Sequence, residues 1–263
     1  MTSPGDPPAD TASQAADRPA RAAKTQGRQA SIWDLSEHGT RGPKPRHDRA
    51  IIAAIAVRIA DAEGLAAVSM RRVAGELGIA VMSLYNYVSA KDHLAQLMTD
   101  QLAGEYAYPA TPAPDPRAAI ADLANQTRDI AGRHPWLAGL MQRPVPPGPN
   151  GLHYLDYFLG LLAGSTLGTG AKLEVIAIIS GFASMYGATQ AGLPAEQAGT
   201  ADAVEQNAAQ VQALVRAAGS GRYPNLAAAL AAADPPRSQD DIFASCIDRF
   251  IDLAGLERPG DRN

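Results

Sequence analysis

The segment between Ser69 and Tyr87 constrains the fold more than any other part of this 263-residue chain. It predicts two short helices, Ser69–Leu77 and Val81–Tyr87, because apolar residues recur in each at helical spacing and Ser69 is a suitable N-cap. Gly78-Ile79 lies between them, where glycine permits a tight turn. Two short helices joined in this way have the proportions of a helix-turn-helix, whose second helix enters the major groove of DNA.

Further helical patterns flank this segment. Apolar residues recur at helical spacing between Asp48, a suitable N-cap, and Gly64, which is expected to end that helix. On the other side, Ser89 is expected to cap a helix that runs from Ala90 to about Tyr106. Prolines between positions 109 and 116 then predict a linker.

Beyond the linker the sequence again favours helices. The predicted segments lie near 116–133, 134–142, 149–163, 171–190, 195–218, 225–232 and 239–253, and the proline-rich stretch 143–151 is expected to be a rigid loop. Alanine is abundant, only 5% of the residues are aromatic, and no segment alternates convincingly in the manner of a strand. We therefore expect an all-α protein.

The distribution of charge separates the chain into regions. Residues 18–104 hold twelve basic and eight acidic residues, whereas residues 105–263 hold eleven and sixteen, within a formal net charge of −4. The N-terminal region is therefore the one suited to a polyanion. Residues 1–30 contain almost no large apolar side chain, so they are expected to be disordered.

Residues 31–47 are expected to form a basic arm. Trp33 is expected to anchor its beginning on the globular body. The candidates for contact with DNA phosphates or the minor groove are Arg41, Lys44, Arg46 and Arg49. A solvated basic linker would have the same composition, so both interpretations stay open.

Several classes of protein are disfavoured. A single cysteine, Cys246, excludes a disulfide framework and a cysteine-based zinc site, and the five histidines show no metal-ligand spacing. No glycine-rich phosphate loop or nucleophile elbow is present, so we expect no metal, no cofactor and no enzyme activity. The N-terminus lacks the apolar core of a secretory signal, and the longest uncharged apolar run, Val175–Ala188, is too short to span a bilayer. A cytoplasmic protein without membrane contact is expected.

One stretch of the sequence resembles a known family. The run Val68–Asp92, VSMRRVAGELGIAVMSLYNYVSAKD, resembles the helix-turn-helix of TetR-family transcriptional regulators. The positions that match the family pattern are Ser69, Ala74, Leu77-Gly78-Ile79, Leu84-Tyr85, Tyr87 and Lys91. The C-terminal region resembles, more loosely, the effector domain of the branch closest to the tetracycline repressor, on Arg133–Leu137, the proline-rich loop and the ending Tyr223–Phe250.

The resemblance implies a division of the chain and a function. A helix-turn-helix DNA-binding domain at 48–106 would precede a helical ligand-binding and dimerisation domain at 116–255 and a tail at 256–263. The implied protein is a homodimeric repressor that a small-molecule effector releases from a pseudo-palindromic operator in double-stranded DNA. Whether it represses or activates stays open, and the alternative is a small-molecule carrier or adaptor that keeps the fold without binding DNA.

The family also implies which residues meet the DNA and where an effector binds. Its DNA contacts fall on Arg71, Val81, Met82, Ser83, Tyr85, Asn86, Tyr87 and Lys91. Ligand sites in helical bundles are mostly apolar, although aromatic residues at helical spacing are also typical of an ordinary core. The candidates for the effector pocket are His134, Trp136, Met141, Tyr154, Tyr157, Phe158, Phe182, Met185 and Tyr186.

Two apolar segments of the second half, Val175–Ala188 and Ile242–Leu253, are expected to contribute to a dimer interface, because the final helices of family members form a four-helix bundle across a twofold axis. Gly181 and Ala183 would permit a close approach of two helices there. Ordinary packing within one chain is the alternative, and the two roles are compatible on different helix faces.

Overall fold

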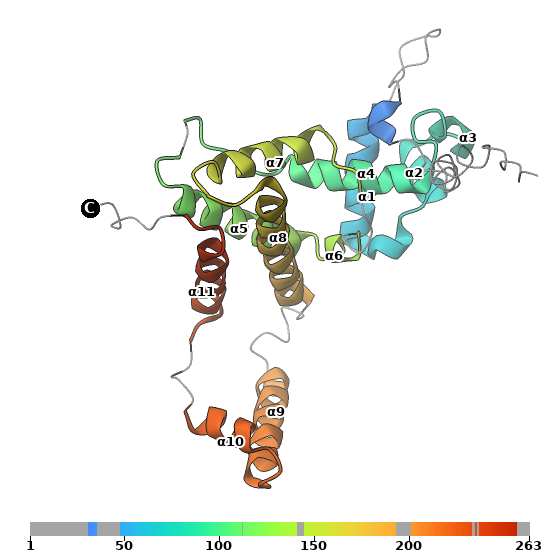
Figure 1. Ribbon diagram of the computed structural model, residues 1–263. Coiled ribbons are helices and arrows are strands. Elements are labelled where there is room, and N and C mark those ends of the chain that lie inside the picture. The colour runs from blue at the N-terminus through green and yellow to red at the C-terminus, as the bar shows by residue number, and fades with distance from the viewer. Residues whose placement is uncertain are drawn as a thin grey trace, which may run out of the picture.

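A computed structural model describes residues 31–35, 48–111, 113–140, 145–192, 201–232, 235 and 237–256. Within these residues the chain forms eleven α-helices and two short 3-10 helices, and it contains no strand (Figure 1). The expected all-α class is confirmed. The segment 1–30, which was expected to be disordered, and the predicted DNA contacts Arg41, Lys44 and Arg46 lie outside the described residues.

The first group of helices shares one hydrophobic core. It comprises the 3-10 helices η1 (Ile32–Asp34) and η2 (Leu65–Ala67) and the helices α1 (Arg49–Glu63), α2 (Met70–Leu77), α3 (Val81–Leu84) and α4 (Lys91–Ala103). The fully buried side chains of this core include Ile32, Ile52, Val73, Leu84 and Val88. The core holds the helix-turn-helix against α1 and α4.

Local signals explain most of these boundaries. Asp48 accepts a hydrogen bond from the backbone N–H of Ile51, and Ser69 accepts one from that of Arg72, so both predicted N-caps are confirmed. Gly78 ends α2 with φ of 66°, in the left-handed region that glycine adopts without a steric penalty.

Two local predictions are wrong. Ser89 does not cap α4, whose N-cap is Ala90. The Ser89 hydroxyl instead lies 3.1 Å from Nδ1 of His93. The second helix of the motif stops at Leu84, before the predicted Tyr87, because the backbone N–H groups of Asn86 and Tyr87 bond to carbonyls three residues back and tighten the chain into a turn.

The second group of helices forms a second core. It comprises α5 (Pro116–Arg133), α6 (Leu137–Leu140), α7 (Pro149–Leu161), α8 (Thr169–Gly192) and α11 (Gln239–Asp252). Phe158, Ile179 and Phe243 are among its most buried side chains. The helix expected over 134–142 begins later than predicted, at Leu137. His134, which precedes a proline, leaves the helical conformation with φ of −127° and ψ of 64°.

Helix α8 packs tightly against α5. A Cβ atom at Gly187 would lie 2.0 Å from the carbonyl oxygen of Arg128, so only glycine fits at this contact. Thr169–Ala191 is also the one described helix that is long and apolar enough to cross a membrane by length and composition. Core helices pass the same test, and this one buries Val175, Ile179 and Ala183 in the second core.

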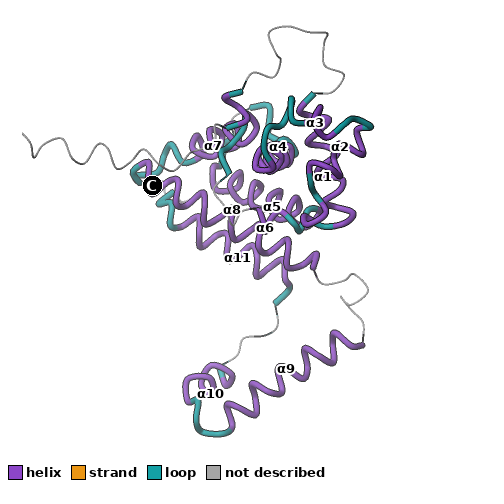
Figure 2. Tube along the Cα trace, turned by 90° about the vertical axis from the view of Figure 1, so that its right-hand side faces the viewer, coloured by secondary structure: helices purple, strands orange, loops and turns teal. Residues whose placement is uncertain are grey.

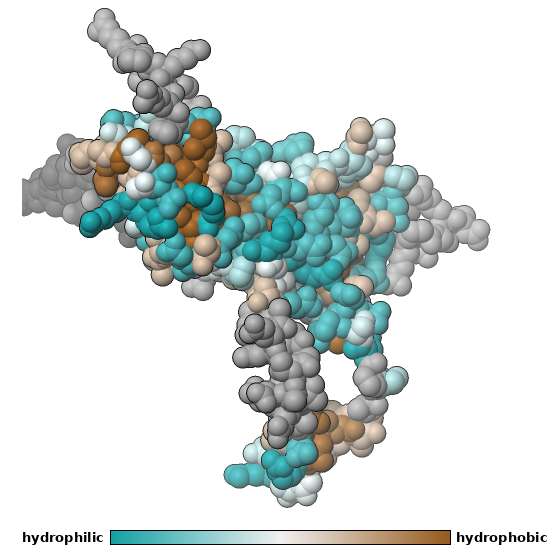
Figure 3. All heavy atoms as spheres, turned by 180° about the vertical axis from the view of Figure 1, so that it is seen from behind, coloured by the Kyte–Doolittle hydropathy of each residue, from teal (hydrophilic) through white to brown (hydrophobic). Residues whose placement is uncertain are grey.

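Helices α9 (Ala201–Gly219) and α10 (Pro224–Ala231) form a hairpin that stands apart from the other helices (Figures 1 and 2). Val211, Leu214 and Val215 on α9 are exposed. A hydrophobic patch covers part of this hairpin in the view from behind (Figure 3). Its apolar surface is therefore not covered within the described part of this chain.

Candidate DNA interface and effector pocket

Helix α3 presents one face to the core and another to solvent. Leu84 and, just beyond the helix, Val88 are fully buried, as the spacing predicts for inward anchors. Met82 is 75% exposed and Tyr85 is 43% exposed, and Asn86 is exposed beside them. Apolar and polar side chains that project from a helix and from the turn after it are suited to thymine methyl groups, base edges and phosphates.

The other residues expected at DNA differ in exposure. Arg71 on α2 and Lys91 on α4 are exposed. Val81 and Tyr87 are half-buried and pack against the first core, and Ser83 is also half-buried. These three side chains therefore have less free surface than Met82, Tyr85 and Asn86.

Arg72 is exposed, but its guanidinium is engaged in ion pairs within the protein. Its guanidinium bonds to Glu63 at the end of α1 and to Glu76 on α2, and Arg58 also reaches Glu76. The hydrogen bond from Arg72 lowers the pKa of the Glu76 carboxyl below its usual value. These ion pairs tie α2 to α1, whereas Arg71, the other arginine of α2, is exposed and forms no ion pair among the described residues.

The first part of the predicted basic arm packs on the globular body. The Ser31 hydroxyl and the Ile32 N–H both donate to Oε1 of Gln96 on α4, at 2.9 Å each. Arg49 is buried and donates to the carbonyl oxygen of Leu35, so its prediction as a DNA contact is wrong. Trp33 packs against the first core, which confirms its predicted role as an anchor.

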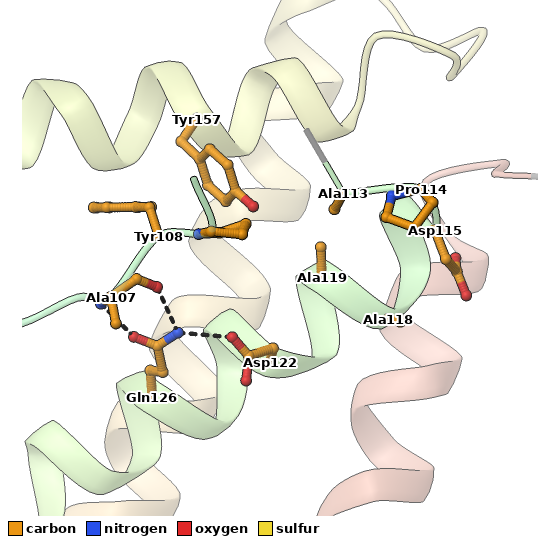
Figure 4. Close-up of a pocket in the computed structure, with 11 residues that line it drawn as sticks. Ala107, Tyr108, Ala113, Pro114, Asp115, Ala118, Ala119, Asp122, Gln126 and Tyr157 are labelled. Atoms are coloured by element: carbon orange, nitrogen blue, oxygen red, sulfur yellow. Dashed lines mark hydrogen bonds between the residues drawn. The ribbon is translucent and has the colours of Figure 1, made fainter. Parts of the chain in front are cut away.

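A pocket of about 680 Å³ opens between the α4–α5 connection, α5 and α7 (Figure 4). That volume lies within the usual range for small-molecule sites. Its lining is mostly alanine and proline with two aromatic rings and a few polar groups. The lining residues are Ala107, Tyr108, Pro109, Ala113, Pro114, Asp115, Ala118, Ala119, Asp122, Gln126 and Tyr157.

One side of this pocket is held by a side-chain amide. Gln126 accepts a hydrogen bond from the backbone N–H of Ala107 at 2.8 Å and donates to the Ala107 carbonyl at 3.0 Å. It also donates to the carboxylate of Asp122 at 2.7 Å. The α4–α5 connection is therefore fixed to α5 at the pocket itself, as Figure 4 shows.

Aromatic rings form the opposite side. Tyr157 projects from α7 toward Tyr108, and the centroids of the two rings are 4.9 Å apart. The ring of His153 also contacts Tyr108, with the two centroids 4.6 Å apart. Burial raises the pKa of Tyr108 to about 12, so the phenol is neutral at physiological pH. Its hydroxyl is buried and has no hydrogen-bond partner among the described residues.

Most of the residues predicted for an effector pocket lie elsewhere. Tyr157 lines the pocket, and Met141 is outside the described residues. Tyr154 and Phe158 are buried in the second core, and Met185 is exposed on α8. Phe182 and Tyr186 pack against Phe243 of α11. This pocket is not lined by Tyr154, Phe158, Phe182, Met185 or Tyr186, and as contacts of an effector these residues stay predictions.

His134 and Trp136 lie at the junction between the two groups of helices. Asp61 on α1 accepts a hydrogen bond from Nε1 of Trp136 at 2.7 Å, and its Oδ1 is 2.6 Å from Nδ1 of His134. The other ring nitrogen of His134 is 3.2 Å from Glu105, which follows α4 and also pairs with Arg133. These two predicted pocket residues therefore connect α1 to the end of α5.

Three residues that shape the pocket were missed from the sequence: Tyr108, Asp122 and Gln126. Tyr108 lies just before the segment expected to be a proline-rich linker, where a tyrosine beside Pro109 is the only available signal. Asp122 and Gln126 have the pattern of a solvated helix face. Only the return of the chain after α4 brings them to Ala107.

Comparisons with known proteins agree with this architecture. Residues 108–258 match the family described as tetracyclin repressor-like, C-terminal domain. The chain is 36% identical over 231 residues to the HTH-type transcriptional repressor DrrR1 of Streptomyces coeruleorubidus, a match that covers 86% of this chain and 83% of that protein. An HTH-type transcriptional regulator of Saccharopolyspora erythraea is 30% identical over 158 residues, which cover 60% of this chain and 66% of that protein.

A solved structure shows the same fold. The Streptomyces coelicolor TetR family protein ActR, in complex with actinorhodin, is 26% identical and superimposes with a TM-score of 0.66, covering 81% of this chain and 100% of ActR. The chain therefore has an N-terminal helix-turn-helix and an all-helical C-terminal part. This combination is typical of helix-turn-helix transcriptional regulators. The chain belongs to the TetR family of these DNA-binding regulators.

Proposed function

We propose that this protein is a homodimeric repressor that binds a pseudo-palindromic operator and is released by a small molecule. The observation that carries the proposal is the outward side of α3 and of the turn that follows it, where Met82, Tyr85 and Asn86 are exposed while Leu84 and Val88 are fully buried. A helix held in this way by its own core can enter the major groove without distortion of the domain.

In the proposed complex the contacts divide into two kinds. Met82, Ser83 and Asn86 face base edges, while Tyr85, Arg71 and Lys91 contact phosphates. Val81 and Tyr87 pack against the first core, and the part of each side chain that remains exposed contacts DNA. Arg41, Lys44 and Arg46 precede α1 and contact the adjacent backbone or minor groove. Two α3 helices related by a twofold axis read half-sites about 34 Å apart.

We propose that residues 48–106 form the DNA-binding domain and residues 116–255 the ligand-binding and dimerisation domain, with a tail at 256–263. Exposed apolar side chains on α8 support dimerisation there: Ile178 and Met185 lie on one helix face with Gly181 between them. Leu253, just beyond α11, adds a further exposed apolar side chain. A DNA-binding regulator of this kind acts in the cytoplasm.

The pocket is placed to influence the DNA-binding part. Ala107, which Gln126 holds at the pocket, is two residues from Glu105, and Glu105 contacts His134, the partner of Asp61 on α1. A ligand that displaces the Gln126–Ala107 contacts therefore acts on the junction with α1. Release requires that the ligand bind the DNA-free conformation more tightly than the DNA-bound one.

Selection of fragmented genomic DNA on the purified full chain, at fixed moderate salt, tests the proposal. We expect recovery of a pseudo-palindromic sequence, and loss of that recovery with a Tyr85→Ala, Lys91→Ala double variant that remains folded. If the folded wild-type protein enriches no sequence above background, the repressor proposal is wrong and a carrier or adaptor function takes its place.

A further inference from the structure

The charge of the pocket between Tyr108 and Tyr157 restricts the ligands that it accepts. Asp115, Ala119, Asp122 and Gln126 follow one another at spacings of three and four residues, so they form a single stripe along α5. Two carboxylates therefore border the pocket, about 10 Å apart along the helix axis. No lysine, arginine or histidine is among the described residues that line it.

The basic residues of α5 do not neutralise these carboxylates. Arg117 is buried and pairs with Asp248 and Asp252 on α11. Arg128 pairs with Asp240 and lies over the ring of Phe243, at 4.7 Å from its centroid. Both guanidinium groups are thus directed to α11, away from the pocket. Within the described residues, neither Asp115 nor Asp122 forms an ion pair.

The two carboxylates are not equivalent. Asp115 caps α5, where its Oδ1 accepts a hydrogen bond from the N–H of Arg117 and the positive end of the helix dipole stabilises its charge. Asp122 lies in the middle of α5, and within the described part of the chain its hydrogen bond comes from Gln126 alone. Asp122 is therefore the carboxylate with more capacity to bind a charged donor on a ligand.

The apolar and aromatic side chains of the pocket indicate the shape and polarity of the uncharged part of the ligand. The alanine and proline side chains favour an apolar body, and the rings of Tyr108 and Tyr157 favour one that is flat and aromatic. Tyrosine rings also attract cations through their π-electrons.

We infer that the ligand of this pocket is a flat aromatic cation, whose amine pairs with Asp122 while its ring system packs against Tyr108 and Tyr157. This inference rests on the proposed function for the identity of the pocket as the effector site. It goes beyond that function by naming the class of ligand. An aromatic carboxylate of the same shape is disfavoured, because it would meet two carboxylates and no basic side chain.

Three probes of one shape test the inference: 9-(aminomethyl)anthracene, 9-anthracenemethanol and anthracene-9-carboxylate. Their binding to the full chain is followed by their fluorescence at neutral pH and about 0.15 M salt, where charges separated by more than about 8 Å are screened. We expect the amine to bind at least about tenfold more tightly than the carboxylate, with the alcohol between them.

Charge and shape are separated by a matched pair of variants. Asp122→Asn keeps the size of the side chain and removes its charge, so we expect the affinity for the amine to fall roughly five- to tenfold while the affinity for the alcohol stays within about twofold. Asp129→Asn makes the same change two turns further along α5, at an exposed position outside the pocket. We expect it to bind all three probes as the wild type does.

The inference is overturned if the carboxylate binds as tightly as the amine, if Asp122→Asn weakens all three probes equally, or if none of them binds. Binding to the selected operator DNA is measured on the same preparations. Operator binding without a preference for the amine overturns the ligand class alone. A preference for the amine in a protein that binds no DNA overturns the repressor function and leaves the ligand class standing.

Discussion

Oδ1 of Asp61, on α1, lies 2.6 Å from Nδ1 of His134, the residue that ends α5. The same oxygen accepts a hydrogen bond from the indole N–H of Trp136. His134 and Trp136 are buried, and Trp136 belongs to the core of the helix-turn-helix group although it follows α5. One carboxylate therefore joins the helices that carry the DNA-binding surface to those that carry the pocket.

Replacement of this carboxylate should weaken the whole molecule. In Asp61→Ala two buried donors lose their acceptor, so we expect the free energy of unfolding to fall by about 2 kcal/mol. Urea denaturation at a fixed protein concentration measures the change. Asp156→Ala removes an exposed carboxylate from α7 and serves as the control, with an expected change below about 0.5 kcal/mol. Equal stability of the two variants would show that the junction does not depend on Asp61.

Much of the N-terminal group could be predicted from the sequence, because its signals are local. Asp48, Ser69 and Gly78 act within one helical turn of themselves, and each performs the role that its residue type predicts. Ser89 does not cap α4, because the helix begins at Lys91 and the residue in the N-cap position is Ala90.

The pocket could not be predicted, because it depends on contacts between residues distant in sequence. Ala107 and Gln126 are 19 residues apart, and Tyr157 comes from a further helix. The same reason applies to Arg49. Its charge predicts exposure, but Arg49 is buried and its guanidinium donates a hydrogen bond to the carbonyl oxygen of Leu35, 14 residues earlier in the chain. Tertiary contacts of this kind leave no periodic pattern in a single sequence.

Substitutions at the exposed residues of α3 and its neighbours should affect DNA binding in two different ways. Tyr85→Ala or Lys91→Ala is expected to weaken binding to every sequence, because each removes a phosphate contact. Lys91→Ala should also reduce the salt dependence of binding, since it removes a positive charge that neutralises a phosphate. Asn86→Ala is expected to cost about 1–3 kcal/mol at a single base position and to change the sequence preference there. Fluorescence anisotropy with operator and mismatched duplexes separates the two effects.

The control for these variants is Tyr223→Ala, which removes an exposed tyrosine just before α10. It should bind the operator as the wild type does. If Tyr85→Ala and Lys91→Ala also retain wild-type affinity, α3 does not dock in the proposed manner.

The contact between α5 and α8 should be intolerant of a single methyl group. Gly187→Ala would place a Cβ 2.0 Å from the backbone oxygen of Arg128, so the two helices must separate. We expect a loss of about 1–3 kcal/mol in the free energy of unfolding, as for other overpacked cores. Gly160→Ala on α7 meets no atom within 4 Å, so its effect should be neutral or slightly stabilising through helix propensity. Thermal denaturation of both variants makes the comparison.

Alkaline pH should destabilise the protein through its buried phenols. Burial raises the pKa of Tyr106, whose hydroxyl lies 2.9 Å from that of Thr127, and also raises the pKa of Tyr154 and Tyr108. The unfolded chain loses these protons near pH 10 while the folded protein retains them. The stabilisation is therefore complete below about pH 10 and is lost as pH rises above it.

Urea denaturation between about pH 8 and pH 11 measures this loss. In Tyr106→Phe one such phenol is absent, so the free energy of unfolding should decrease less steeply with pH than in the wild type. Parallel slopes for the two proteins would contradict a raised pKa of Tyr106. Lysines also titrate in this range, but they do so in both proteins and do not affect the comparison.

The exposed apolar face of α8 should hold the proposed dimer together. Ile178 is 44% exposed and Met185 is 59% exposed, and both lie on the same side of the helix. An Asp at either position places a charge in the interface, where it has no partner and its burial is unfavourable. Ile178→Asp or Met185→Asp should therefore sediment as a monomer and bind operator DNA weakly, since one protomer reaches one half-site.

Leu152→Asp makes the same change at an exposed leucine of α7 and should remain dimeric. If the α8 variants also remain dimeric, the interface lies on another surface, and the exposed Val211 and Val215 of the α9–α10 hairpin are the next positions to replace.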